Sequence, residues 1–252
     1  AAQNTILFEN WFKHLLELEL IVPYLARAGS LVDVGGGVGV NLLCLRALGY
    51  TGRLTLIDRF ADYDENNRMG PQHAARTRLE RANIEVLESN FWPTLTIPAE
   101  DGSFDVATSF DVLEHLPGNP IQHLTEIRRV LKPGGAVVAG APNAAGFMHR
   151  VDLALRGKHP YAHFDDWMRE PYYEHYREYT PREYREILAR SGFRVMEQEL
   201  SSAVPRARAR NRYHNRKHSW FSPTPYALYG ILAFETLLPG TRHTVYTIGR
   251  KA

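Results

Sequence analysis

Leu31-Val32-Asp33-Val34-Gly35-Gly36-Gly37-Val38-Gly39-Val40 joins a short apolar run to a glycine-rich turn. The run carries one acid, Asp33, and the turn holds four glycines within five residues. Residues 41–45 are mostly apolar and predict the start of a helix. Glycines let the backbone approach a ligand closely, and a helix N-terminus offers unpaired N–H groups. A strand, a glycine turn and a helix in this order therefore predict a site for a nucleotide-like ligand.

The length and composition of the chain indicate a globular protein. At 252 residues it is long for one ordinary domain and short for two, which favours a single α/β domain over 1–252 with insertions. A formal net charge of +2 is too small to indicate nucleic-acid binding. The single cysteine, Cys44, cannot form an internal disulfide, which fits a reducing compartment. No window reaches the roughly 18 apolar residues of a membrane span, and the N-terminus is unlike a signal peptide. We therefore expect a cytoplasmic protein.

Apolar segments alternate with helical patterns between residues 31 and 142, which predicts a parallel sheet with helices on both faces. A helical segment within 1–30, over 4–22, precedes this unit and is expected to end at Pro23. Lys132-Pro133-Gly134-Gly135 is expected to stop a helix over 120–131. Thr180-Pro181-Arg182-Glu183 predicts a later helix start with a capping box. The predicted strands are 31–34, 53–58, 84–87, 104–109, 136–141, 193–197 and 244–248.

Two insertions interrupt this alternation and are expected to cap the active site beyond the carboxyl ends of the strands. Residues 144–180 are rich in aromatic and histidine side chains. Residues 201–241 hold an arginine-rich run over 206–217, then an apolar helix over 226–238. The run could close over an anionic group or be a solvated loop. The helix could pack on the core, line a lipid-tolerant groove or form a homodimer contact.

The spacing of the glycines leaves two kinds of ligand open. Gly35 and Gly37 fit the G-x-G-x-x-G pattern of dinucleotide sites, but Val40 occupies its third glycine position, whereas Gly39 fits a tighter spacing. Asp58 ends the second predicted strand about 20 residues on, where an acid can hold ribose hydroxyls. Because both kinds of ligand contain a ribose, Asp58 does not discriminate between them.

Three motifs distinguish between these two kinds of ligand. The stretch 32–39, then Phe104-Asp105-Val106-Ala107-Thr108-Ser109-Phe110-Asp111-Val112-Leu113-Glu114-His115-Leu116, then Leu131-Lys132-Pro133-Gly134-Gly135, resembles class I S-adenosylmethionine-dependent methyltransferases of the type 11-like kind. Among these it is most similar to small-molecule O-methyltransferases. The resemblance implies a Rossmann-like, seven-stranded, mostly parallel sheet with the last strand antiparallel, and S-adenosylmethionine as the cofactor.

The resemblance also implies roles for residues of the cofactor site. The methionine part would lie among Asp33 and the glycines, and the ribose would bind Asp58. Many members have an acid after the third strand to reach the adenine; here Asn90 and Phe91 stand in its place. The implied cofactor-binding residues are Asp33, Gly35, Gly37, Gly39, Asp58, Asn90, Phe91 and Phe110.

Three histidines are candidates for the catalytic base. Methyl transfer to a hydroxyl needs in-line alignment and removal of a proton, and histidine titrates near the working pH. His115 and His149 follow predicted strands, and His175 lies in the aromatic insertion. Loops after parallel strands gather at one edge of the sheet, where ligands bind. Any one of these histidines could instead pack on a helix or the surface, but we expect at least one to be catalytic.

A metal site is a second interpretation of part of this region. Asp111, Glu114 and His115 have the spacing i, i+3, i+4, which puts them on one face of a helical turn, and carboxylates suit Mg²⁺. The stretch resembles the metal-binding segment of ubiquinone-pathway O-methyltransferases. Glu-His at this point also occurs in metal-independent relatives, where it orients the helix.

The aromatic insertion bears on the methyl acceptor. Seven aromatic residues between 161 and 179 are interleaved with acids and histidines, a composition that suits a sugar, although they could equally pack on the sheet. The stretch 175–180 resembles methyltransferases of cell-surface polysaccharide and glycolipid pathways, which favours a saccharide hydroxyl. A phenolic, quinone or amino-sugar acceptor remains the alternative.

Two functions of other classes are also open. Tyr213 and Lys217 match the Tyr-x-x-x-Lys of short-chain dehydrogenases, which would make the chain an NAD-dependent oxidoreductase. The pair falls in the arginine-rich run, where that family does not place it, so we interpret the match as chance. The chain could also be an inactive, cofactor-binding regulatory partner.

Overall fold

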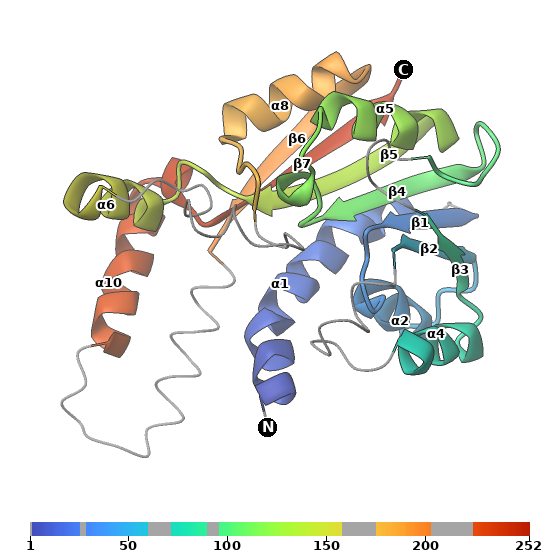
Figure 1. The fold of residues 1–252 in the computed structure, drawn as a ribbon, viewed down its shortest axis with the longest axis horizontal. Coiled ribbons are helices and arrows are strands. Elements are labelled where there is room, and N and C mark those ends of the chain that lie inside the picture. Colours follow the sequence, from blue (N-terminus) through green and yellow to red (C-terminus); the bar gives the residue numbers. More distant parts are fainter. Residues whose placement is uncertain (1, 26–28, 60–71, 90–95, 158–174, 203–223) are drawn as a thin grey trace.

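A seven-stranded sheet in the order β3-β2-β1-β4-β5-β7-β6 forms the centre of the computed structural model (Figure 1). The structure describes residues 2–25, 29–59, 72–89, 96–157, 175–202 and 224–252. β7 pairs antiparallel with both β5 and β6, and the other pairs are parallel. The strands are β1 (Ser30–Val34), β2 (Arg53–Asp58), β3 (Glu85–Glu88), β4 (Phe104–Phe110), β5 (Leu131–Pro142), β6 (Phe193–Ser201) and β7 (Thr244–Lys251). This confirms the predicted Rossmann-like sheet.

Helices cover both faces of the sheet (Figure 1). One face carries α1 (Ala2–Leu25), α2 (Val40–Ala47) and α4 (Gln72–Arg81). The other carries α5 (Pro120–Val130) and α8 (Pro181–Arg190). Two more helices, α6 (Phe147–Arg156) and α10 (Thr224–Leu237), lie beyond the end of the sheet. They contact each other through Phe147 and Phe234, whose ring centroids are 4.4 Å apart.

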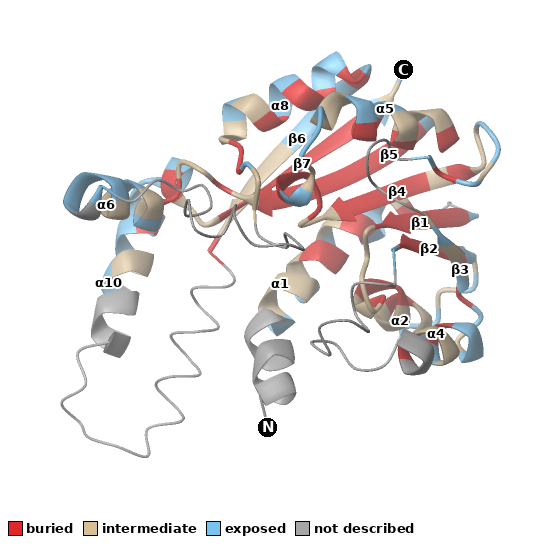
Figure 2. Ribbon diagram, in the orientation of Figure 1, coloured by how far each residue is buried: buried red, intermediate tan, exposed pale blue. Residues whose placement is uncertain are grey.

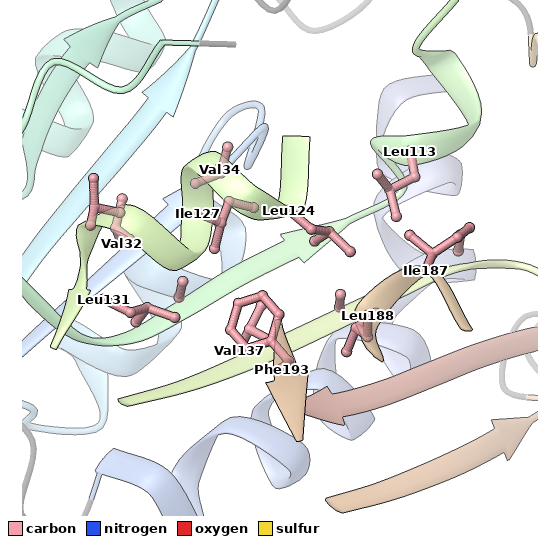
Figure 3. Packing of buried hydrophobic residues seen from close by; sticks show 14 of the residues in the cluster. Val32, Val34, Leu113, Leu124, Ile127, Leu131, Val137, Ile187, Leu188 and Phe193 are labelled. Carbon is pink, nitrogen blue, oxygen red and sulfur yellow. The ribbon is translucent and has the colours of Figure 1, made fainter. Parts of the chain in front are cut away.

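The alternation of side chains along the strands produces two cores. Val32 and Val34 of β1 pack with Leu124 and Ile127 of α5 on one face (Figure 3). Leu31, the residue before Val32, points the other way and packs with α1 and α2 on the other face. The central strands are buried on both faces (Figure 2), which explains their continuous apolar sequence.

Two of the element boundaries that differ from expectation have a clear physical cause. α1 continues through Pro23 to Leu25, and its buried apolar residues are Leu18, Ile21 and Leu25, whereas Val22 is exposed. Pro23 stands in the last turn, so we attribute the continuation to the burial of Leu25, which offsets one lost helical hydrogen bond. β5 begins at Leu131 because that residue already pairs with Phe104, ahead of an irregularity in the β4–β5 register. The predicted helix stop is therefore also the start of a strand.

α8 begins with the capping box that the sequence predicts. The Thr180 hydroxyl accepts a hydrogen bond from Glu183 N at 3.3 Å, and Glu183 Oε2 accepts one from Thr180 N at 2.8 Å. Thr180→Ala is expected to lower the free energy of unfolding by about 1 kcal/mol, because a helical N–H loses its acceptor. Urea denaturation measures this, with Thr180→Ser as the control that keeps the hydroxyl. Equal losses in both variants would contradict the capping role.

The described helices include none that is long and apolar enough to cross a membrane.

Candidate active site

The glycine turn connects β1 to α2 at the carboxyl edge of the sheet. Gly35 and Gly39 have φ angles of 78° and 72°, in the left-handed region that disfavours other residues. A Cβ at Gly35 would lie 2.3 Å from Val112 Cγ2, so space as well as backbone conformation requires glycine there. Gly35 N also donates to Ile57 O at 2.7 Å, which ties the turn to β2.

Asp33 lies beneath this turn and is 2% exposed. Its Oδ1 accepts a hydrogen bond from Thr108 Oγ1 at 2.7 Å. Burial raises the pKa of Asp33 to about 7, with the Thr108 hydrogen bond opposing the shift and the charges of Glu17 and Asp58 adding to it. A cationic group of a ligand nearby would favour the ionised form.

Asp58 ends β2 on the other side of the turn. Its Oδ2 accepts a hydrogen bond from Gly37 N at 2.7 Å, and its Oδ1 accepts one from Arg59 N at 2.6 Å. The turn and both acids are therefore gathered at one place, as predicted. A glycine backbone beside two buried carboxylates fits a ligand that carries an ammonium group and a ribose.

Of the remaining predicted cofactor residues, only Phe110 lies in the part of the chain that the structure describes. Phe110 ends β4, and its ring meets that of Tyr246 edge to face at 5.9 Å. Asn90 and Phe91 lie outside the residues that the structure describes, as does the arginine-rich run 206–217.

The N-terminal helix brings polar side chains to this edge that the sequence analysis did not single out. Glu17 Oε2 accepts a hydrogen bond from Asn41 Nδ2 at 2.8 Å, and His14 Nδ1 lies 3.0 Å from the same oxygen. Lys13 forms an ion pair with Asp111 across 98 residues of chain. Burial lowers the pKa of Lys13, and the charges of Glu17 and Glu114 oppose that shift. The i, i+4 spacing of Lys13 and Glu17 was the available signal.

The predicted metal ligands are only partly grouped. Glu114, on the short helix η1 (Leu113–His115), is fully buried, and neither carboxylate oxygen has a hydrogen-bond partner among the described residues. Burial raises its pKa to about 7. One ligand atom from each of Glu114, His115 and His175 lies within 4.8 Å of the others. The structure thus puts His175 in this group, while Asp111 instead pairs with Lys13.

Two of the three predicted histidines face one carboxylate, and the third lies against one of these two. His149 Nε2 lies 2.9 Å from Glu178 Oε2, and His175 Nδ1 lies 2.8 Å from Glu178 Oε1. The His175 ring meets the His115 ring edge to face, with centroids 4.7 Å apart. Burial would raise the pKa of Glu178, but the combined hydrogen-bonding and charge interactions with the two histidines outweigh burial and lower the pKa to about 2. Glu178 was not among the predicted site residues, although its i+3 spacing from His175 is visible in the sequence.

A cavity of about 500 Å³ adjoins this segment between α5 and α8. Tyr176, Arg177 and Tyr179 line it, but the three histidines do not. We therefore assign it no part in the chemistry.

Comparisons with known proteins identify the family of this chain. The sequence model of a family described as a methyltransferase domain matches residues 5–198. An uncharacterised protein of transposon Tn4556 from Streptomyces fradiae is 39% identical over 120 residues, 47% of this chain and 32% of that protein. A probable S-adenosylmethionine-dependent methyltransferase from Mycolicibacterium smegmatis is 30% identical over 134 residues, 53% of this chain and 42% of that protein. The chain thus aligns with less than half the length of these relatives.

Solved structures share the fold. An S-adenosylmethionine-dependent methyltransferase from Mesorhizobium loti superposes with a TM-score of 0.60 at 18% identity, covering 96% of this chain and 98% of the other. Phosphoethanolamine N-methyltransferase 2 from Haemonchus contortus, in complex with S-adenosylmethionine, gives 0.58 at 16% identity, covering 93% and 52%. The family match extends over the glycine turn, Asp58 and the histidine cluster, and this chain is a member of the methyltransferase domain family.

Proposed function

We propose that this protein transfers a methyl group from S-adenosylmethionine to a hydroxyl of a small molecule, and that the acceptor is a saccharide. The observation that carries the proposal is the glycine turn flanked by Asp33 and Asp58, in a chain of the methyltransferase domain family. The name of the Mycolicibacterium relative supports the choice of methyl donor.

Different residues at the glycine turn would bind different parts of the cofactor. S-adenosylmethionine supplies a methyl group on a positively charged sulfur. Asp33 would accept its α-ammonium group, Asp58 would accept hydrogen bonds from the ribose hydroxyls, and Gly37 would let the backbone approach. We assign Phe110 to the reacting end, and Asn90 and Phe91 to the adenine.

Cofactor binding is expected to strengthen as the pH rises from about 5.5 to about 7 and then to level off. The pKa of Asp33 is about 7 in the free protein, so its carboxyl is largely protonated below that pH. The ligand ammonium favours the ionised form, so the proton must leave on binding, and the dissociation constant falls up to about tenfold per pH unit. Calorimetry in buffers of different ionisation enthalpy measures the released proton. Asp33→Asn should remove most of this dependence, and an unchanged pH profile in that variant would contradict the assignment.

The acceptor hydroxyl needs a base, and the cluster of His115, His149 and His175 is our candidate for it. A histidine that removes the hydroxyl proton as the oxygen attacks the methyl group in line avoids forming a free alkoxide. The ordered carboxylate–histidine contacts at Glu178 support a catalytic role over simple surface packing. Mg²⁺ assistance is a second possibility, through Glu114 and His115 with Asp111 or, as the geometry favours, with His175.

The saccharide acceptor rests on the composition of the insertion 144–180 and on its resemblance to polysaccharide and glycolipid methyltransferases. Residues 158–174 of that insertion lie outside the described residues. Amines belong in the same test, because a similar structure is named as an N-methyltransferase. Phenolic and quinone acceptors complete the set.

Two measurements test the proposal. Calorimetric titration with S-adenosylmethionine and with NAD⁺ distinguishes a methyltransferase from an oxidoreductase, and binding of NAD⁺ alone would refute our assignment. Methyl transfer from labelled S-adenosylmethionine is then assayed against sugars, phenols and amines, with Mg²⁺ and with a chelator. Binding without transfer to any acceptor would favour a regulatory partner.

A further inference from the structure

Glu178 is the point at which the histidine cluster is joined. Glu178 is 5% exposed, and each of its two oxygens faces a different histidine. We propose that Glu178 is a positioning residue that fixes the tautomer of His175, so that neutral His175 carries its proton on Nδ1 and its lone pair on Nε2. The catalytic consequence of this arrangement rests on the function proposed above, but the arrangement itself does not.

The main chain around Glu178 is held at both ends of its segment. Tyr176 N donates to Glu114 O at 2.7 Å, which fixes the segment to η1 after β4. Ala144 N donates to Tyr179 O at 3.2 Å, which fixes it to the end of β5. The Glu178 carboxylate is therefore presented from a backbone that two strands of the sheet position.

The chemistry of a carboxylate decides where the protons lie. An ionised carboxylate only accepts hydrogen bonds, so each ring nitrogen that faces it must carry a proton. Glu178 stays ionised at neutral pH, because its pKa lies at about 2. His175 therefore donates from Nδ1 to Oε1 at 2.8 Å, whereas His149 Nε2 lies 2.9 Å from Oε2 as an ion-pair contact.

The consequence concerns His175. An isolated neutral histidine prefers its proton on Nε2, so Glu178 holds His175 in the less common tautomer. The lone pair of neutral His175 is thereby directed to the ring nitrogen opposite Glu178. The His175 ring adjoins His115, and one of its nitrogens lies within 4.8 Å of a Glu114 oxygen. A lone pair fixed in this way serves proton abstraction and also metal ligation, in which a carboxylate partner commonly orients the histidine.

The proposal is tested by the nitrogen-15 shifts of the histidine rings, from long-range proton–nitrogen spectra at a pH where the rings are neutral. His149→Asn and His175→Asn assign the signals. In the unmodified protein we expect the Nδ1–H tautomer at His175 and the Nε2–H tautomer at His149. Because the unmodified protein gives this result by itself, a variant that fails to fold does not prevent the test.

Glu178→Gln is the informative variant, because glutamine replaces one acceptor oxygen of the carboxylate by an amide group that donates, and so no longer requires a proton on His175 Nδ1. We expect His175 to shift toward the Nε2–H tautomer and His149 to stay unchanged. Glu186→Gln is the matched control: Glu186 is half-exposed, pairs with Arg190, and should leave both rings as they are. With an acceptor identified above, Glu178→Gln should lower kcat roughly 10–100-fold and leave the affinity for S-adenosylmethionine unchanged.

Two outcomes overturn the proposal: a His175 ring in the Nε2–H form in the unmodified protein, or an unchanged His175 tautomer in folded Glu178→Gln. Failure to bind S-adenosylmethionine would instead refute the proposed function and leave the tautomer result standing. A normal kcat in Glu178→Gln together with a shifted His175 tautomer would show that Glu178 fixes the tautomer but that turnover does not depend on it.

Discussion

His175→Ala is expected to lower kcat by about 10²–10⁴-fold, the usual contribution of a positioned general base. Of the three candidate histidines, His175 is the one that contacts both Glu178 and the His115 ring. Its removal takes away the proposed proton acceptor but leaves the glycine turn in place. The affinity for S-adenosylmethionine should therefore remain unchanged.

The measurement is the single-turnover rate at saturating cofactor, together with the calorimetric dissociation constant. His149→Ala should also lower turnover, but less, because it removes a partner of Glu178 and leaves the proposed base, His175, in place. His243→Ala is the matched control: this histidine lies beside Thr244 at the start of β7 and should keep full turnover. If His175→Ala turns over normally, His149 or His115 becomes the preferred base.

The sheet could be predicted from the sequence because its signals are local. Each strand of the parallel core is a short apolar run bounded by a turn, and β2 (Arg53–Asp58) matches its predicted range at both ends. The capping box at Thr180 is likewise encoded within four residues. Among the boundaries that differ, those at Pro23 and Leu131 depend on contacts with distant residues, which no local pattern records.

The residues of the candidate site likewise include some that local sequence patterns could predict and some that they could not. Asp33 and Asp58 could be predicted because each ends or interrupts a strand beside the glycine turn. The Lys13–Asp111 pair could not be predicted, because it joins the N-terminal helix to the residue after β4. The His149–Glu178 contact could not be predicted either, because it joins α6 to a later loop. The sequence suggested Asp111 as a ligand beside Glu114 by helical spacing. The structure gives Asp111 a φ of 52° and turns it to Lys13, so the spacing rule does not apply there.

Asp58→Ala is expected to weaken binding of S-adenosylmethionine by about 1.5–3 kcal/mol, or roughly 10–150-fold in the dissociation constant. In our proposal Asp58 accepts hydrogen bonds from the ribose. It also holds Gly37 N at 2.7 Å, so the alanine variant loses a ligand contact and a support of the turn together.

Two further variants separate these contributions. Asp58→Asn keeps an oxygen for Gly37 N but removes the negative charge, so its affinity should lie between those of alanine and the unmodified protein. Asp105→Ala is the control, because Asp105 lies near the start of β4, at the opposite end of the strands from the glycine turn. It accepts hydrogen bonds from Ser30 and Lys132, so its loss should lower the stability of the fold and leave the affinity for S-adenosylmethionine unchanged. An Asp58→Ala protein that binds with normal affinity would remove Asp58 from the cofactor site. Equal losses in alanine and asparagine would show that the charge, and not the support of Gly37, carries the effect.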